Sequence, residues 1–513
     1  MGKKSKRNRN KQATLESSTG APVAPALRQQ GGNNEKETKE SLRFEDPFVE
    51  EYDDEEDWQG DEEDAVDDDA GIEIIQSWNP LTADSLEPGQ KLEMDPSAYK
   101  MHHALTAEWP SLTFDFLRDH LGEGRTRFPH SLIAAVGTQA EKPEDNQLVV
   151  MKLSDLSRIQ VETEDDLLGE EYDPDKDDND DDSDDESDEE VDLDPVMEHF
   201  AMKHYGGVNR IRAMPQQSQI VATWSDAGSV NLYNVEPIMQ RFSLAEQSAG
   251  GGDMIQMKDI PSKPFFSYEK HGTEGYAIDW SPVKQGSLVT GDCSGAIHLW
   301  TPRPEGGYNV APSYEASSNT QKSVDHSPSV EDLQWSPSEA TVFASAECGG
   351  FVRIFDTRAP NRAMLSHKIH SSNADVNVLS WNKLVHNLLA TGGDDGVLSV
   401  WDLRHFSKAG DVPSPLARFS PHKTPITSVE WHPTDESMLA VTDDNGAYIY
   451  DLSVEEDDVA PNHVEEGAAI PPQLLFVHCG SEQFKEIHWH PQISSCCMTT
   501  ALSGYSVFIP SNL

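Results

Sequence analysis

The sequence predicts an all-β protein, a seven-bladed β-propeller, from three observations. A strand ending in tryptophan, commonly followed by Ser-Pro or His-Pro, recurs at Trp280, Trp335, Trp381, Trp431 and Trp489. Each is followed by a second apolar strand, a turn carrying glycine, and a third strand that ends in an aromatic residue. The first and last aromatic residues of a unit are 19 or 20 residues apart, whereas successive tryptophans are 46 to 58 residues apart. A fixed unit joined by variable connections indicates one structural module with insertions in its loops.

The strands within each unit have the alternation that a sheet requires. Apolar residues occupy positions i and i+2 of the first strand, as in Ile278 with Trp280 and Leu333 with Trp335. Asp395-Gly396 and Asn445-Gly446 are typical of tight hairpins, because both central residues of such a turn need positive φ. About 40 to 45 residues per unit with four strands is typical of a propeller blade.

Two further units complete the expected ring. Ala213, Gly228 and Tyr233 form a sixth copy with alanine at the tryptophan position, and the segment 125–153 is expected to be the seventh blade. Because the last unit ends at Leu513 without a fourth strand, we expect residues 112–117 to complete it. Asp95-Pro96 predicts the start of a short N-terminal helix over about 96–107, and a loop is expected over 302–327.

The charge of the chain is concentrated outside the repeats. Asp and Glu number 91 against 39 Lys and Arg, for a net charge of −52. Residues 45–69 and 162–194 hold 37 of these acids, and we expect both stretches to be disordered because they repel themselves and lack apolar surface. The expected organisation is a basic tail over 1–44, an acidic segment over 45–94, and a propeller over 95–513 with an acidic insertion at about 160–196. The insertion supplies the candidate acidic arm: Asp177, Asp178, Asp180, Asp181, Asp182, Asp184, Asp185 and Glu186.

This composition bounds the partners. So large a negative charge repels nucleic acid and membrane surfaces and attracts basic proteins, so we expect a basic protein partner, no direct nucleic acid, no membrane, and a monomer. The five cysteines have no metal-ligand spacing, which favours reduced thiols in an intracellular protein. The N-terminus opens with a basic cluster of the kind that nuclear import receptors bind: Lys3, Lys4, Lys6, Arg7, Arg9 and Lys11.

Trp401-Asp402 after Asp395-Gly396, with His370 upstream, resembles the WD-repeat consensus. That resemblance implies a buried hydrogen-bond network of turn Asp, upstream His, strand Ser or Thr and terminal Trp. The turns Ser294-Gly295 and Cys348-Gly349-Gly350 lack the turn Asp, so the network is not expected in those blades.

The stretch Glu108-Trp109-Pro110-Ser111-Leu112-Thr113 resembles the N-terminal module of histone-binding WD-repeat proteins of chromatin assembly complexes. With its acidic insertion and basic N-terminus, the chain as a whole is similar to the glutamate-rich WD-repeat proteins of ribosome biogenesis. That resemblance implies a dedicated chaperone of a large-subunit ribosomal protein, L-three, in the nucleus and nucleolus and also in the cytoplasm. A histone-binding chaperone is the alternative.

Candidate site residues follow from the repeat alignment. Residues at the start of each first strand are expected to form the partner-binding top face of the propeller: Glu274, Tyr276, Glu331, Asp375, Asn377 and Thr427. Asp395, His370 and Thr391 superficially suggest a catalytic triad, but the WD network uses the same residue types, and no other catalytic motif occurs, so no enzyme activity and no cofactor or metal is expected.

Two further motifs leave alternatives open. Asp356-Thr357-Arg358 and Asp402-Leu403-Arg404 end adjacent blades with a D-x-R pattern that docks the adaptor of cullin-RING ligases, although these arginines can equally form structural ion pairs. Ser183 and Ser187 precede acidic residues and match acidophilic kinase sites, or they simply solubilise the arm.

Overall fold

A computed structural model describes residues 79–81, 92–159, 194–247, 263–315, 328–359, 362–370, 374–406, 413–455 and 470–513. All of them belong to the unit Ile75–Leu513. The predicted basic tail, nearly all of the acidic segment over 45–94, and the acidic insertion with its arm residues, Ser183 and Ser187 lie outside the described residues. No described helix is long and apolar enough to cross a membrane.

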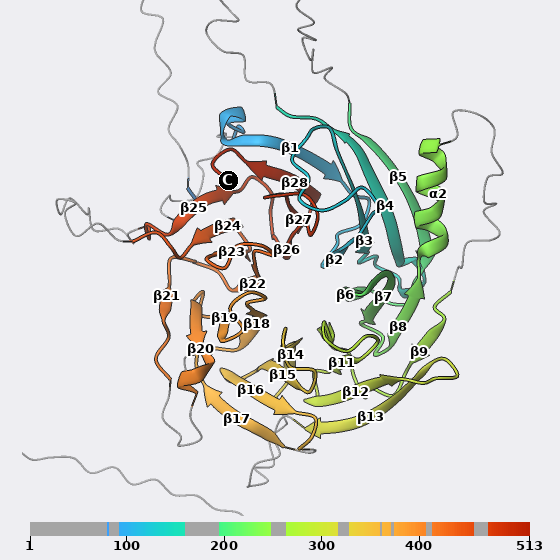
Figure 1. Cartoon of the computed structure of the whole chain (residues 1–513), viewed down its shortest axis with the longest axis vertical. Coiled ribbons are helices and arrows are strands. Elements are labelled where there is room, and N and C mark those ends of the chain that lie inside the picture. Colours follow the sequence, from blue (N-terminus) through green and yellow to red (C-terminus); the bar gives the residue numbers. More distant parts are fainter. Residues whose placement is uncertain are drawn as a thin grey trace, which may run out of the picture. The chain divides into compact units, whose positions relative to one another are not determined.

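Seven four-stranded antiparallel sheets are arranged as the blades of a ring (Figure 1). Blade 1 contains β2 (Phe114–Leu117), β3 (His130–Gly137), β4 (Gln147–Leu156) and β5 (Val196–Lys203). Blade 2 contains β6 (Val208–Met214), β7 (Gln217–Ser225), β8 (Val230–Asn234) and β9 (Phe266–Tyr268). Blade 3 contains β10 (Ala277–Trp280), β11 (Leu288–Gly291), β12 (Ala296–Pro302) and β13 (Tyr308–Glu315). The predicted seven-bladed fold is confirmed.

The remaining blades repeat this plan. Blade 4 contains β14 (Val330–Trp335), β15 (Val342–Glu347), β16 (Phe351–Asp356) and β17 (Ala363–Lys368). Blade 5 contains β18 (Val376–Trp381), β19 (Leu388–Gly393), β20 (Leu398–Asp402) and β21 (Ala417–Phe419). Blade 6 contains β22 (Ile426–Trp431), β23 (Met438–Asp443), β24 (Gly446–Asp451) and β25 (Leu474–His478). Blade 7 contains β26 (Glu486–Trp489), β27 (Cys497–Ala501), β28 (Gly504–Pro510) and, from the start of the described chain, β1 (Tyr99–Thr106).

The ring closes through β1, which corrects two predictions. The helix expected over 96–107 is wrong: only Pro96–Ala98 form a 3₁₀ turn, capped by Asp95, whose carboxylate accepts a 2.9 Å bond from the Ser97 amide. The residues after it pair with β28, from Tyr99 opposite Pro510 to Thr106 opposite Gly504. The free edge of β28 offers a full ladder of backbone partners, and pairing with it overrides the local helix-start signal.

The prediction that residues 112–117 complete the last blade is also wrong. Phe114–Leu117 is the innermost strand of blade 1, and Phe116 occupies the position that tryptophan holds in other blades. Phe114 and Leu117 are both fully buried, as an innermost strand packed between two neighbouring blades requires. The seventh blade expected over 125–153 is confirmed, with β3 and β4 as its middle strands.

Two elements were not expected from the sequence. β13 pairs with β12 where a loop over 302–327 was predicted. Helix α2 (Glu236–Gln247) follows β8; the Asn234 side chain accepts a 3.0 Å bond from the Glu236 amide at its start. Pro237 in the first turn is the sequence signal for this helix. Its Ile238 and Phe242 pack with Val235 against blade 1.

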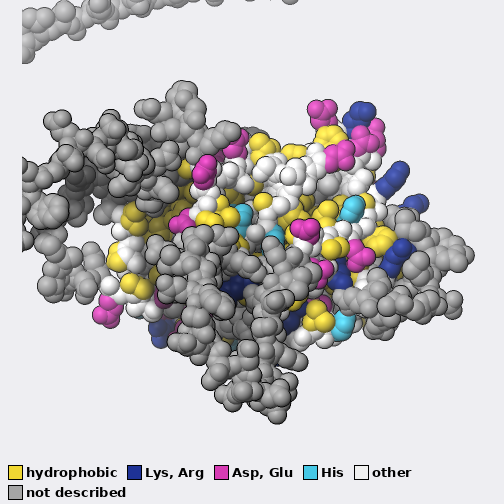
Figure 2. All heavy atoms as spheres, turned by 90° about the horizontal axis from the view of Figure 1, so that it is seen from above, with side chains coloured by type: hydrophobic (Ala, Val, Ile, Leu, Met, Phe, Trp, Pro, Cys, Tyr) yellow, Lys and Arg dark blue, Asp and Glu magenta, His cyan; other side chains and the backbone are white. Residues whose placement is uncertain are grey.

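Apolar side chains fill the spaces between neighbouring blades. One cluster combines Trp224 of blade 2 with Trp280 and Trp300 of blade 3, all nearly inaccessible to solvent. On the outer side shown in Figure 2, acidic and basic side chains are interspersed among apolar ones. The core of this unit therefore lies between the blades.

Candidate functional site

The two ends of the ring carry different loops. We call the end at which the innermost strands β2, β6, β10, β14, β18, β22 and β26 begin the upper face, and the end at which they finish the lower face. β4 runs antiparallel to β3, and β3 to β2, so β4 ends at the lower face. The acidic insertion that follows β4 therefore leaves the ring from the lower face.

All six predicted partner-binding residues lie at the upper face. Tyr276 directly precedes β10, and Glu331, Asn377 and Thr427 are the second residues of β14, β18 and β22. Glu274 and Asp375 lie two positions before Tyr276 and Asn377. The alignment on the tryptophans thus brings these residues together at the starts of adjacent innermost strands. Their role in binding stays a prediction.

Four carboxylates of blades 3 to 5 form what we call the acidic arc: Glu274, Glu331, Asp375 and Asp394. They accept hydrogen bonds from uncharged donors at 3.5, 3.2, 2.6 and 2.9 Å, namely Asn209 Nδ2, Cys348 Sγ, the Gly349 amide and Asn377 Nδ2. Within the described part of the chain, no lysine or arginine forms an ion pair with any of the four. Their negative charge is therefore available to a cationic ligand.

The groups between these carboxylates respond to that charge. Burial, with the neighbouring carboxylates of Glu274 and Glu331, raises the pKa of the Tyr276 hydroxyl to about 12. Burial and the carboxylate of Glu331 likewise raise the pKa of the Cys348 thiol. Both groups therefore stay protonated at physiological pH and act as neutral hydrogen-bond donors, and they add no charge of their own to the arc.

A surface cavity of about 590 Å³ continues the acidic arc between blades 2 and 3. Glu274 lines it together with Asp226, Glu269 and Tyr205, whose ring is 68% exposed. Carboxylates beside an open aromatic ring suit lysine and arginine side chains, through ion pairing and cation–π attraction.

Thr427 differs from the other predicted residues. Its hydroxyl contacts Thr442 Oγ1 at 2.9 Å and donates to the Phe484 carbonyl at 3.2 Å. It therefore links blade 6 to blade 7. On the same side of the ring, Lys485 forms a 2.8 Å ion pair with Asp444, so this part of the upper face is compensated in charge.

In blades 1, 3, 4, 5 and 6, the residue before the tryptophan position has a structural role that was not expected from the sequence. Its side chain accepts a hydrogen bond from the backbone amide of the tryptophan-position residue in the next blade. Five such bridges join neighbouring innermost strands: Asp115 to Ala213, Asp279 to Trp335, Gln334 to Trp381, Ser380 to Trp431 and Glu430 to Trp489. The signal was visible, because an acceptor side chain precedes four of the five tryptophans.

Glu486 joins three blades where the ring closes. From blade 7, its buried carboxylate accepts a 2.9 Å bond from the Phe114 amide of blade 1. It also pairs with Arg210 and Arg212 of blade 2 at 3.0 and 2.9 Å. Although burial alone would raise the pKa of Glu486, Arg212 and His488 hold it well below its usual range.

His488 lies between the carboxylates of Glu430 and Glu486. Its Nδ1 is 2.9 Å from Glu430 and its Nε2 is 3.4 Å from Glu486. Burial alone would lower the pKa of His488, but Glu486 and Glu430 raise it to about 9. The imidazole is therefore cationic at physiological pH. We call the group of Glu486, Arg210, Arg212 and His488, where blade 7 meets blades 1 and 2, the seam; its positive and negative charges compensate one another.

The triad-like group of blade 5 is a structural network. His370 contacts Asp395 and Thr391, each at 3.0 Å, and the Trp401 indole donates to Thr391 at 2.9 Å. Blade 3 contains the same hydrogen-bond network. His271 contacts Asp292 at 2.9 Å and Thr290 at 2.8 Å, and the Trp300 indole donates to Thr290. The expectation that blade 3 lacks the network is wrong, because Asp292, three residues before Gly295, supplies the carboxylate.

Blade 4 lacks this network among the described residues, as expected. There Ser345 donates to Glu347 at 2.6 Å, and Glu347 pairs with Arg353. No group of three or more potential metal ligands gathers in the described part of the chain.

The two D-x-R motifs lie at the lower face of blades 4 and 5. In each, the arginine forms a bidentate ion pair with the aspartate two residues before it, at 2.6 Å for Arg358 with Asp356 and 2.5 Å for Arg404 with Asp402. Both arginine side chains remain about 70% exposed, at 71% and 69%. The motif thus forms its own ion pair and still presents a guanidinium to solvent.

Comparison with known proteins agrees with this architecture. Residues 89–157 match the family model of the histone-binding protein RBBP4 and the equivalent component of the CAF1 complex, and residues 364–402 and 413–451 match the WD domain, G-beta repeat. The chain is 36% identical to ribosome assembly protein rrb1 of Schizosaccharomyces pombe, covering 91% of this chain and 92% of that one. It is 38% identical to glutamate-rich WD repeat-containing protein 1 of Dictyostelium discoideum, covering 84% of each. The chain belongs to the family of glutamate-rich WD-repeat proteins.

Other members and more distant relatives share most of the ring. Protein HEAT STRESS TOLERANT DWD 1 of Arabidopsis thaliana is 42% identical, over 85% of this chain and 91% of its own length. Histone acetyltransferase type B subunit 2 of Candida glabrata is 25% identical, over 82% of this chain and 86% of its own length. The similarity of this chain to that protein thus extends well beyond residues 89–157.

Proposed function

We propose that this glutamate-rich WD-repeat protein is a dedicated chaperone that binds a newly made, basic ribosomal protein of the large subunit and delivers it to nuclear pre-ribosomes. The acidic arc is the observation that carries the proposal, since its carboxylates have neutral donors but no ion-pair partners among the described residues. The name of the S. pombe relative, ribosome assembly protein rrb1, supports the same process. The resemblance to the glutamate-rich WD-repeat proteins implies that the bound ribosomal protein is L-three.

The mechanism is charge substitution. A ribosomal protein rich in lysine and arginine binds stray RNA or aggregates until rRNA neutralises it. Carboxylates of the arc, the neighbouring cavity and the acidic insertion would compensate that charge reversibly, with an affinity that falls as salt rises. Delivery of a newly made ribosomal protein to pre-ribosomes implies that the chain resides in the nucleus and nucleolus and also passes through the cytoplasm. Imaging of the tagged chain tests this localisation.

Binding of purified L-three to the full chain tests the proposal. The variant Glu274→Gln, Glu331→Gln and Asp375→Asn removes three charges of the arc, and the control variant Glu305→Gln, Glu339→Gln and Glu436→Gln removes three exposed charges from the lower face. At 0.1 M salt we expect the arc variant to bind roughly tenfold more weakly, because each surface ion pair contributes up to about 1 kcal/mol. The control variant should bind as the wild type does. Equal affinities for all three chains would refute the arc as the binding surface.

Histone binding is the second candidate function, favoured by the match of residues 89–157 to the RBBP4 family model. Purification of the tagged chain from cell extract at low and high salt separates the two. Recovery of histones without a large-subunit ribosomal protein would overturn the chaperone proposal in favour of this one.

Docking of a ligase adaptor is a third candidate, favoured by the exposed guanidinium groups of Arg358 and Arg404. The double variant Arg358→Ala and Arg404→Ala should abolish co-purification of the adaptor. An adaptor that remains bound to this variant would exclude docking through the D-x-R motifs.

A further inference from the structure

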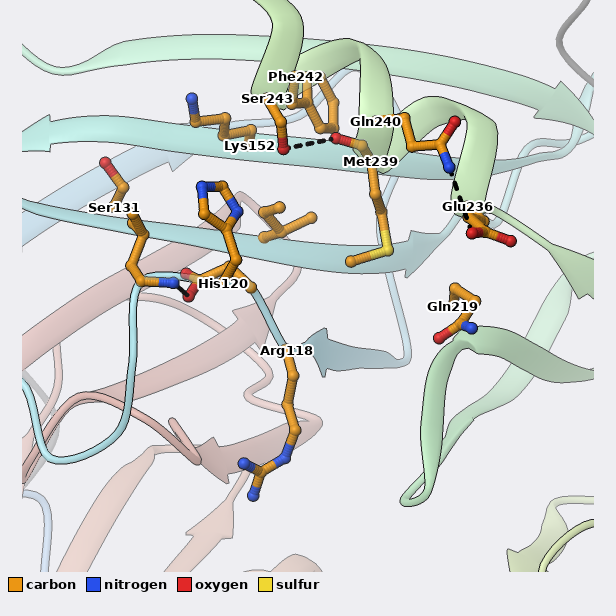
Figure 3. A pocket seen from close by; sticks show the side chains of 13 residues that line it. Arg118, His120, Ser131, Lys152, Gln219, Glu236, Met239, Gln240, Phe242 and Ser243 are labelled. Atoms are coloured by element: carbon orange, nitrogen blue, oxygen red, sulfur yellow. Dashed lines mark hydrogen bonds between the residues drawn. The ribbon is translucent and has the colours of Figure 1, made fainter. Parts of the chain in front are cut away.

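Two apolar recesses between neighbouring elements of the ring differ in what fills them. A groove of about 540 Å³ opens between blade 1 and helix α2, where Figure 3 shows Met239 of the helix opposite His120 and Ser131. Arg118, which also lines this groove, is already paired with Glu123 at 2.6 Å. By contrast, the space between blades 5 and 6 is filled by a short segment of the chain itself. The occupied recess thus identifies its own ligand.

The segment is Asn79-Pro80-Leu81, which precedes β1 and belongs to neither a helix nor a strand. Pro80 and Leu81 are nonetheless buried, and the Leu81 side chain is only 2% exposed. A leucine outside regular structure is buried to this degree only where other side chains enclose it.

The enclosing side chains come from blades 5 and 6. The apolar cluster that contains Leu81 includes Phe419 of blade 5 and Trp431 and Tyr450 of blade 6, all of them buried. Leu474 packs against the same cluster. Phe419 and Leu474 lie in β21 and β25, the outermost strands of the two blades. The cluster therefore extends to the outside of the ring, from which a segment that precedes the ring can enter it.

The local sequence suits this entry. The Asn79 side chain accepts a 3.0 Å hydrogen bond from the Leu81 amide, which closes a turn of the kind that asparagine favours. Pro80, between them, has a fixed φ and no amide hydrogen that needs a partner. Because the Leu81 amide is bonded locally, the leucine can enter the core without pairing to a strand.

We propose that Asn79-Pro80-Leu81 is an anchor that fastens the N-terminal acidic segment, residues 45–69, to blades 5 and 6. The segment contains 16 acids among 25 residues. The anchor rests on the proposed function in one respect, since the acids that it positions compensate the charge of the basic client. Blade 5 also carries Asp375 and Asp394 of the acidic arc, so the anchor and part of the arc belong to the same blade.

The anchor shortens the tether between the acidic segment and the ring. Asp69 precedes Asn79 by 10 residues, a span of up to roughly 35 Å. The next hydrogen bond to the ring in the described chain is at Ala98, whose carbonyl accepts a 2.9 Å bond from the Ser511 amide. Ala98 follows Asp69 by 29 residues, a span of up to roughly 100 Å. Since effective concentration falls roughly as the −3/2 power of tether length, the anchor raises that of the segment about fivefold.

Amide hydrogen exchange on the full chain tests whether the anchor is docked. We expect the amide of residue 81 to exchange at least about tenfold more slowly than in a free peptide of residues 75–86, because a docked amide is shielded. Leu81→Asp should abolish this protection. The control Leu384→Asp makes the same change at a leucine of the lower face that is 47% exposed, and it should preserve the protection.

Three results of the exchange experiment would overturn the proposal. The first is wild-type exchange equal to that of the free peptide, and the second is protection that survives Leu81→Asp. The third is protection that increases with protein concentration, which would assign the recess to the same segment of a second copy of the chain.

Binding of L-three at 0.1 M salt tests whether the anchor positions the acidic segment. Leu81→Asp should bind about fivefold more weakly than the wild type, because the tether lengthens from 10 to 29 residues. In a full chain whose 16 acids of residues 45–69 are replaced by Asn and Gln, Leu81→Asp should leave the affinity unchanged. An equal loss with and without these acids would show that Leu81 acts through the folding of the ring, which overturns the proposal. Equal affinities of the wild type and Leu81→Asp would overturn it as well.

An oligolysine peptide in place of L-three separates the anchor from the proposed function. We expect the same fivefold loss on Leu81→Asp, again only in the chain that keeps the acids of residues 45–69. If oligolysine showed this pattern while L-three bound to none of the chains, the proposed function would fail and the anchor would stand. If L-three bound while neither ligand responded to Leu81→Asp, the anchor would fail and the proposed function would stand.

Discussion

The acidic arc and the seam around Glu486 use the same residue types for opposite purposes. At the seam, Glu486 is 1% exposed and is surrounded by Arg210, Arg212 and His488 within 3.4 Å. In the arc, the hydrogen-bond partners of Glu331 and Asp375 in the described part of the chain are a thiol and a backbone amide. A carboxylate whose charge is compensated inside the fold stabilises the fold, whereas one left uncompensated at the surface is available to a partner.

The difference matters because net charge alone does not separate the two roles. Breaking a buried ion pair leaves the remaining charges uncompensated and costs several kcal/mol, whereas removing an exposed charge changes stability little.

The largest effect is expected for Glu486→Ala. The substitution leaves Arg210, Arg212 and the Phe114 amide without their shared acceptor, so we expect a loss of about 3 to 5 kcal/mol in the free energy of unfolding. Urea unfolding followed by tryptophan fluorescence measures it. The arc variant Glu274→Gln, Glu331→Gln and Asp375→Asn is the comparison and should unfold within about 0.5 kcal/mol of the wild type. Equal losses in the two variants would erase the contrast between the seam and the arc.

The next effect is a loss of stability in alkaline solution that depends on His488. Its pKa is raised from about 6.5 in the unfolded chain to about 9 in the fold, so its contribution is fully present below pH 6.5. It is lost as pH rises from 6.5 through 9, by on the order of 2 to 3 kcal/mol. His488→Gln should be less stable than the wild type at pH 6 and should lose less stability between pH 6.5 and 9. If the midpoint of thermal unfolding fell equally steeply with pH in the wild type and in His488→Gln, groups other than His488 would cause the pH dependence.

The sequence predicted the ring and the positions of Glu274, Glu331 and Asp375 of the arc, but not Asp394, because the predicted positions follow from the spacing around the tryptophans. Glu331 and Asn377 were placed correctly at the upper face by counting back from Trp335 and Trp381. The closing strand was misplaced, because the choice between residues 99–106 and 112–117 depends on which strand meets the free edge of β28. Local patterns do not contain that information.

The seam was missed for a related reason. Arg210 and Arg212 lie 274 or more residues before Glu486 in the chain and become neighbours only when blade 7 meets blades 1 and 2. By contrast, the acceptors before the tryptophans were visible in the sequence. Asp292 was also visible, three residues before Gly295, but it was overlooked because the carboxylate was sought directly before the glycine.

Asp279 is neither paired like Glu486 nor placed in the arc. It accepts a 2.7 Å bond from the Trp335 amide, and burial raises its pKa to about 7, above the value of about 3.9 expected in the unfolded chain. Ionisation therefore opposes folding, and the wild type loses stability from this group as pH rises from about 4 to 7. Asp279→Asn keeps a carbonyl acceptor for the bridge and removes the charge, so its stability relative to the wild type should increase over that pH range, by on the order of 3 kcal/mol, because one pKa unit corresponds to about 1.4 kcal/mol. If thermal unfolding instead showed the variant to be less stable than the wild type at pH 7, the charged form of Asp279 would stabilise the fold, as the charged form of Glu486 does.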